Sequence, residues 1–233
     1  MEPNYQHQRL RANIGCGATP TPGWLNFDNS LTVRLATAPW LLKGLRVFGV
    51  LEGHQVQFAV VARSHGIRWA NAAHRIPLPD RSVDAIYSSH MIEHLDVERE
   101  LPLFLAEVRR VLVPTGIVRL AVPDLRRRAE KYLERRDADE FVASLHMADH
   151  NPRTVRAHIR SLILGPRNHR WMYDAKSLIK ILNQNGLCNP QEMPPGKTSI
   201  IDPGMLDLRE REEESVYVEA SSSPLRCTTN RTR

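Results

Sequence analysis

Apolar and polar residues follow two periods along this chain, and segments with one period alternate with segments with the other. Short apolar runs that fit buried strands lie at 12–16, 24–28, 67–71, 83–88 and 117–123. An alternating run at 214–220 predicts a further strand. Helical spacing marks 97–116 and 173–186, and each of these segments ends at a glycine. Strands that alternate with helices indicate parallel α/β packing.

Residues 31–51 do not fit this alternation because they are unusually apolar. Arg34, Lys43 and Arg46 interrupt the segment, so it contains no uncharged run of the length that spans a membrane. Two interpretations stay open. The segment is either a lid helix on the domain's own core or an amphipathic helix that makes peripheral contact with a membrane.

Length and composition indicate one globular domain. The chain has 233 residues, of which 42% are hydrophobic and 25% are charged. We expect a single domain over 1–220, with a lid or interfacial insertion at 31–65. Residues 124–170 run helical and basic, and we interpret them as an insertion over the site. The polar residues 221–233 are expected to form a flexible tail.

The start of the chain and its cysteines predict a cytoplasmic protein. The first residues are polar and charged, so no secretory signal is visible. Cys16, Cys188 and Cys227 are an odd number at wide spacings. They predict no disulfide framework and fit a reducing compartment.

The net charge of +6 leaves two interpretations of the basic runs at 109–110, 126–128 and 135–136. They either meet an acidic partner, such as nucleic acid, anionic lipid or a phosphorylated substrate, or form the solvated faces of helices. Interleaved acids such as Glu130 and Glu140 favour the second interpretation, since they can pair with the arginines.

The stretch "NIGCGATPTPGWLNFD" (13–28) places a Gly-x-Gly turn after the first predicted strand. A dinucleotide-binding loop needs a third glycine where this chain has Pro20, and an acid about 20 residues after the first glycine. Here Asp28 follows sooner, and the prolines disfavour an immediate helix. Both departures argue against a nicotinamide or flavin enzyme.

Four further stretches follow in a fixed order: "IPLPDRSVDAIYSSHMIEHL" (76–95), "LAEVRRVLVPTGIVRLAVPDL" (105–125), "WMYDAKSLIKILNQNG" (171–186) and "SVYVEA" (215–220). With 13–28, they resemble the class I S-adenosylmethionine-dependent methyltransferases over nearly the whole chain. Within that class, the chain is similar to small methyltransferases associated with bacterial polysaccharide and cell-surface glycan biosynthesis. The resemblance implies a Rossmann-like fold, with a seven-stranded, mostly parallel sheet, helices on both faces and an antiparallel last strand.

The resemblance also implies S-adenosylmethionine as cofactor and assigns residues to it. Gly15, Cys16 and Gly17 would form the turn under its methionine part, where a missing Cβ allows close approach. Asp28 would accept hydrogen bonds from the ribose hydroxyls, although an Asx turn is its structural alternative. Further cofactor contacts are expected from Asn71, Ala72 and Ser89.

His90 is the candidate catalytic residue, because a hydroxyl acceptor must lose a proton and a histidine can take it. Substrate binding, a cofactor contact and a structural role are its alternatives. Glu93 and His94 fit packing or shaping of the cofactor pocket. The pattern His90-x-x-Glu93-His94 is not H-E-x-x-H and shows no matching third ligand in the sequence. No metal is therefore expected.

Aromatic rings and cations gather after the basic insertion, where we expect the substrate to bind. Sugars stack on aromatic faces, and arginines hold phosphates or carboxylates. The alternative is that the aromatic residues fix the next helix to the core. The candidates for substrate binding are His169, Arg170, Trp171 and Tyr173.

The sequence thus predicts methyl transfer, with a hydroxyl of a glycan precursor or related small molecule as acceptor. An RNA ribose methyltransferase is the first alternative, motivated by the basic charge. A non-catalytic scaffold at the membrane is the second. Nucleic acid is disfavoured, because residues 88–91 lack the Asp/Asn-Pro-Pro-aromatic loop of base amino methylation.

Overall fold

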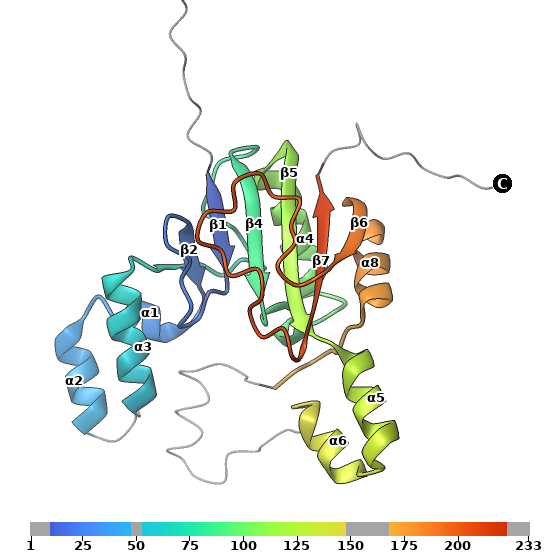
Figure 1. Cartoon of the computed structure of the whole chain (residues 1–233). Helices are drawn as coiled ribbons and strands as arrows, with labels where there is room; N and C mark the ends of the chain where they lie inside the picture. The colour runs from blue at the N-terminus through green and yellow to red at the C-terminus, as the bar shows by residue number, and fades with distance from the viewer. Residues whose placement is uncertain (1–9, 48–52, 148–167, 223–233) are drawn as a thin grey trace, which may run out of the picture.

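The structure is a computed structural model that describes residues 10–47, 53–147 and 168–222. Its centre is a seven-stranded sheet in the order β3-β2-β1-β4-β5-β7-β6 (Figure 1). The five strands from β3 to β5 pair in parallel, and β7 runs antiparallel to both of its neighbours. The predicted fold class is confirmed. The strands are β1 (Arg11–Ile14), β2 (Leu25–Asp28), β3 (Arg68–Trp69), β4 (Val83–Ser89), β5 (Leu112–Pro123), β6 (Cys188–Met193) and β7 (Ser215–Ser221).

One face of the sheet is covered by α4 (Glu100–Val111) and α8 (Ala175–Gln184), which lie behind it in Figure 1. Both helices have apolar residues at helical spacing, and these pack with the inward side chains of the strands in the main core. Phe104 and Leu105 of α4 are fully buried there. α4 ends before the predicted position 116, since β5 already starts at Leu112.

A long loop, residues 194–214, crosses the opposite face of the sheet in front of β4 and β5 (Figure 1). Its Ile200 and Leu206 pack with Tyr87, Ala121 and Tyr217 in a second, smaller core. The loop therefore covers this face of the sheet.

A buried ion pair attaches this loop to the sheet. Arg119 of β5 and Glu219 of β7 are cross-strand partners, with 2.8 Å between Nη1 and Oε1. Arg119 also donates to the carbonyls of Lys197 and Leu208, and Glu219 accepts from the Thr198 hydroxyl and the Ser199 amide. Both charged side chains are almost fully buried. Because the loop supplies these four hydrogen-bond partners, the buried pair holds the loop against the sheet.

The apolar segment 31–51 forms α1 (Leu31–Leu35) and α2 (Pro39–Val47), with its last residues outside the described ranges. Together with α3 (Gly53–Ser64), α1 packs around Cys16 and Ile67 in a third small core. α2 exposes Trp40. Among the described helices, none is long and apolar enough to cross a membrane. The choice between lid and interfacial helix stays a prediction.

The predicted insertion at 124–170 begins with α5 (Leu125–Arg135) and α6 (Ala138–Ser144). Its later part, which includes His150 and His158, lies outside the described residues, as does most of the predicted tail. Cys188 at the start of β6 is disulfide-bonded, a bond that the sequence, which indicated no disulfide framework, did not predict. Wide spacing along the sequence does not fix the distance between cysteines in the fold.

Candidate functional site

The turn after β1 has the geometry that its glycines predict. Gly15 and Gly17 have φ of 72° and 50°, a left-handed conformation that side chains with a Cβ rarely adopt. A Cβ on Gly15 would lie 2.5 Å from Cγ of Met91, whereas a Cβ on Gly17 would meet nothing within 4 Å. Gly15 therefore serves the packing of the turn on Met91, and the open space for a ligand lies at Gly17.

Asp28, at the end of β2, is bound to this turn. Its Oδ2 accepts from the Gly17 amide at 3.0 Å, and its Oδ1 accepts from the Ser30 amide at 2.8 Å. Burial raises the pKa of the carboxyl, and the two amides oppose that shift. The Asx turn named as the alternative is present, yet each oxygen keeps a second lone pair for a ribose hydroxyl.

The other predicted cofactor residues border the same end of the sheet. Cys16 is buried, and burial, reinforced by the nearby Asp28, raises the pKa of its thiol far above the usual value, so it is an unreactive packing residue. Asn71 follows β3 and uses its side-chain oxygen to accept from the Ala73 amide at 3.2 Å. Ala72 is buried, and Ser89 ends β4. Their contacts with a cofactor stay predictions.

His90 follows β4 with φ of 48° and lies beside the start of β7. Its Nε2 is 2.8 Å from the Ser215 hydroxyl, and its Nδ1 is 3.2 Å from Nη1 of Arg211. A guanidinium can only donate, so Nδ1 accepts and Nε2–H faces Ser215. Burial, followed by the charge of Arg211, lowers the pKa of His90 to about 3. The ring is therefore neutral at physiological pH.

The candidate substrate residues continue on the segment 168–173, which is bound to the short 3-10 helix η1 (Ile92–His94). The amides of Arg170 and Trp171 donate to the Glu93 carbonyl at 2.7 and 3.2 Å. The Trp171 side chain is 45% exposed, while Arg170 pairs with Glu100 at 3.0 Å.

Tyr173 differs from the other candidate substrate residues, because its side chain is fully buried in the main core. Its backbone forms a parallel bridge with Asp124, and its carbonyl accepts from the Leu125 amide. The structure thus places it under the site, in the role that the alternative interpretation gave it. His169 is half-buried and stacks edge-on against His94.

Sequence reasoning missed three residues of the loop 194–214 and of β7 that reach this region. Tyr87 and Thr19 both donate to the carboxylate of Glu210, which ties the loop to the turn after β1. Arg211 and Ser215 contact His90. They lie far from the recognisable motifs in the sequence, so no local signal marked them.

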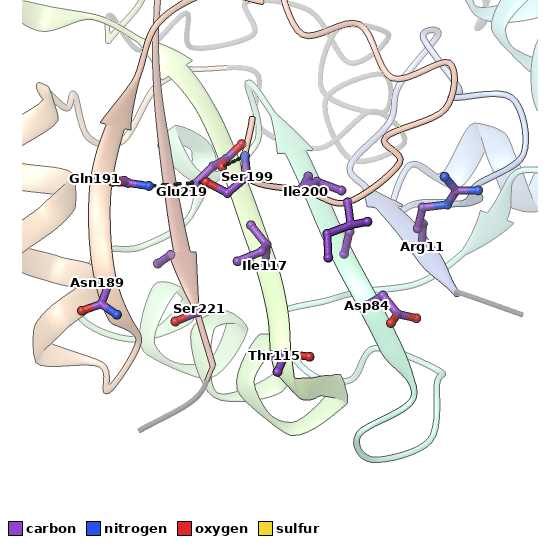
Figure 2. Close-up of a pocket in the computed structure, with 13 residues that line it drawn as sticks. Arg11, Asp84, Thr115, Ile117, Asn189, Gln191, Ser199, Ile200, Glu219 and Ser221 are labelled. Atoms are coloured by element: carbon purple, nitrogen blue, oxygen red, sulfur yellow. Dashed lines mark hydrogen bonds between the residues drawn. The ribbon is translucent and has the colours of Figure 1, made fainter. Parts of the chain in front are cut away.

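A cavity of about 430 Å³ lies elsewhere, on the face of the sheet that the loop 194–214 only partly covers. Figure 2 shows Arg11 and Asp84 at one side of it and Gln191 and Glu219 at the other. None of the turn glycines nor Asp28 lines it. It is therefore separate from the candidate cofactor site.

Comparison with known proteins identifies the class of domain. Residues 36–120 match the family model described as "Methyltransferase domain". This match begins after the glycine turn and covers less than half of the chain. No curated protein matches the chain.

Among solved structures, a SAM-dependent methyltransferase of Methanosarcina mazei is similar with a TM-score of 0.51 and 14% identity, covering 94% of each chain. A SAM-dependent methyltransferase of Thermotoga maritima has a TM-score of 0.47 and 16% identity, covering 92% of this chain and 82% of its own. At such identities the first likeness supports the fold alone.

S-adenosylmethionine fits the residues present. The left-handed turn leaves open space at Gly17, and the half-buried carboxylate of Asp28 keeps free lone pairs beside it. The family match within this sheet, together with that turn, shows that the chain is an enzyme with an S-adenosylmethionine-dependent methyltransferase domain.

Proposed function

We propose that the methyl acceptor is a hydroxyl group of a glycan precursor, such as a nucleotide-linked sugar, or of a related small molecule. The observation that carries the proposal is the exposed ring of Trp171. The backbone of Trp171 is hydrogen-bonded to η1, and η1 follows His90 closely in the chain. A flat, half-exposed ring at the border of the site offers a stacking surface for a sugar.

Cations on the same side of the site favour an acceptor that carries a phosphate. Arg211 contacts His90, and the charge of Arg128 also lowers the His90 pKa, so both guanidinium groups lie near the imidazole. Glu214 partly neutralises them, at 3.3 Å from Arg128 and 3.7 Å from Arg211. A phosphate can replace this exposed carboxylate as their partner.

When bound, S-adenosylmethionine supplies an already activated methyl group, so the chain's main task is to hold the acceptor in line. His90 is the proposed proton acceptor. Its low pKa makes it a weak base, but an attacking hydroxyl becomes strongly acidic as its oxygen gains the methyl group. Ser215 fixes the ring by accepting from Nε2–H, so the proton would go to Nδ1, and Arg211 must withdraw from this nitrogen when the acceptor binds.

The basic runs of α5 give less support to the RNA alternative. Arg126 pairs with Glu130 at 2.9 Å, and Glu140 pairs with both Lys131 and Arg135. These pairs are the solvated helix face that the sequence offered as the second interpretation. A nucleic-acid surface would leave more of these cations free for phosphates.

The test is transfer of label from methyl-labelled S-adenosylmethionine to a panel of nucleotide-linked sugars, neutral oligosaccharides and RNA. We expect label in at least one nucleotide-linked sugar, and a fall in kcat of about 100-fold in His90→Gln. Trp171→Ala should raise KM for the sugar and leave affinity for S-adenosylhomocysteine unchanged.

Label in RNA alone, with steep salt dependence, would replace the glycan proposal with the RNA alternative. If a folded protein that binds S-adenosylhomocysteine labels no acceptor in the panel, the proposed acceptor class is refuted, and the assignment of the cofactor is not affected. A folded protein that does not bind S-adenosylhomocysteine would favour the scaffold alternative.

A further inference from the structure

Three side chains that can bind a metal, those of Glu93, His94 and His169, lie where the segment 168–172 packs on η1. Besides the two amides that donate to the Glu93 carbonyl, Nδ1 of His94 lies 3.1 Å from the carbonyl of Asn168. The ring centroids of His94 and His169 are 5.1 Å apart. Residues far apart in the sequence are thus held together by backbone hydrogen bonds that do not use the carboxyl of Glu93.

The carboxyl of Glu93 is the unusual member of this group. The side chain is fully buried, and neither oxygen has a hydrogen-bond partner in another residue among those described. Burial raises its pKa to about 8. The buried hydroxyl of Tyr173 also lacks a partner, and the charge of Glu93 acts on its pKa. A buried carboxyl without partners is costly, so its place in the fold needs an explanation.

The geometry supplies one. One ligand atom each from Glu93, His94 and His169 lie within 4.8 Å of one another. In a tetrahedral zinc site with bonds of about 2.0–2.1 Å, the ligand atoms are ~3.3 Å apart. Side-chain rotations that move the atoms by about 1 Å each would therefore close the site without moving the backbone.

His94 has the tautomer that metal binding through Nε2 requires. Since a carbonyl can only accept, Nδ1–H of His94 donates to Asn168, which leaves the lone pair on Nε2 for a metal. A carbonyl that fixes the tautomer in this way is the usual outer partner of a metal-binding histidine.

We propose that Glu93, His94 and His169 bind a divalent transition-metal ion, with Zn²⁺ as the best match. Two imidazoles and one carboxylate suit Zn²⁺, whereas Mg²⁺ and Ca²⁺ prefer sites made of oxygen alone. Binding gives the buried carboxyl of Glu93 the partner that its oxygens lack among the described residues. The fourth position is left for water, a substrate oxygen or a further side chain.

This site adjoins the proposed acceptor site without depending on it. Glu93 Oε1 lies 3.5 Å from Nδ1 of His90, and the ring of His146 lies 5.4 Å from that of His169. The sequence showed the pattern His90-x-x-Glu93-His94 without a matching further ligand, and no metal was expected. The third ligand comes from another segment and becomes visible only in the fold.

The experiment uses the full chain without a histidine tag, stripped with a chelator and then dialysed. Calorimetric titration with Zn²⁺ should show one equivalent bound, Co²⁺ should give the visible absorption bands of a tetrahedral site, and Mg²⁺ should give no signal. Glu93→Gln keeps the shape of the neutral side chain and should weaken Zn²⁺ binding by at least about tenfold, as should His169→Ala. His65→Ala, which changes an exposed histidine directly after α3, is the matched control and should bind like the wild type.

A thermal-unfolding measurement guards against variants that simply unfold. At the same Zn²⁺ concentration, the Tm of the wild type and of His65→Ala should rise by equal amounts, and the Tm of Glu93→Gln should rise less. The proposal is overturned if the wild type binds no Zn²⁺, or if Glu93→Gln and His169→Ala both bind it as tightly as His65→Ala does. Methyl transfer is not part of this readout, so the proposed function stands or falls separately.

Discussion

The buried pair Arg119–Glu219 gives the sharpest test of how the loop 194–214 is held. Arg119→Met removes a guanidinium that is 0% exposed and leaves Glu219 as a buried, uncompensated charge. Breaking one side of such a pair costs about 3–5 kcal/mol. The carbonyls of Lys197 and Leu208 lose their donor as well, so we expect the upper half of that range.

The double variant Arg119→Met/Glu219→Gln removes the stranded charge together with its partner. We expect it to recover about 1–3 kcal/mol relative to Arg119→Met alone, because a neutral amide is less costly to bury than a carboxylate. Arg126→Met is the matched control, since its pair with Glu130 is exposed to solvent on α5, and we expect no measurable loss of stability from it.

Urea unfolding at neutral pH measures these differences through the transition midpoint. With a slope of about 2–3 kcal/mol per molar urea, a loss of ~4 kcal/mol lowers the midpoint by about 1.5–2 M. The reasoning would be refuted if Arg119→Met cost less than ~1 kcal/mol, or if the double variant were no more stable than Arg119→Met.

Three further predictions concern the turn, the cofactor and acid stability. Gly15→Ala should lower the free energy of unfolding by about 1–3 kcal/mol and weaken S-adenosylhomocysteine binding, because the new Cβ is strained and meets Met91. The double variant Gly15→Ala/Met91→Ala should recover part of this loss. Calorimetry that finds normal binding in Gly15→Ala would contradict the prediction. Asp28→Asn should bind S-adenosylhomocysteine about 10–100-fold more weakly. Only the ionised carboxyl accepts from the ribose hydroxyls, and its pKa is raised, so wild-type affinity should fall as pH drops toward that pKa, whereas the affinity of Asp28→Asn should stay flat. The hydrogen bond with Arg110 lowers the pKa of Glu107 in the folded state. The stabilisation from this carboxylate is therefore present above its unfolded-state pKa and is lost as the pH falls through its folded-state pKa. Glu107→Gln should be less stable than the wild type by about 1 kcal/mol at neutral pH and equally stable in acid, as measured by urea midpoints across pH.

The sequence was sufficient to place the parallel strands along the chain, because apolar runs and glycine turns are local signals. It was insufficient for β6, since "CNPQEM" carries a proline and mostly polar residues and pairs only with β7 at the edge of the sheet. The start of β5 was also missed, because the helix predicted over 97–116 was expected to end at Gly116, which lies within the strand.

The candidate site was predictable only where a motif carries it. Gly17 and Asp28 were predicted to act together, and the structure joins them by a hydrogen bond. Ser215 and Arg211 were not predicted, since their proximity to His90 follows from the antiparallel return of β7 and the loop before it. Tyr173 was assigned to the substrate from its chemistry, but its place in the core depends on packing that no short stretch encodes.

The loop 194–214 gives this fold an order of assembly. The residues that cover the front of β4 and β5 come from the last part of the chain, after all but one strand of the sheet. During synthesis, the earlier strands can pack against α4 while their other face stays bare. Glu210 then reaches the turn after β1 only when the loop docks, so a growing chain cannot complete the border of its cofactor site until its C-terminal region has left the ribosome.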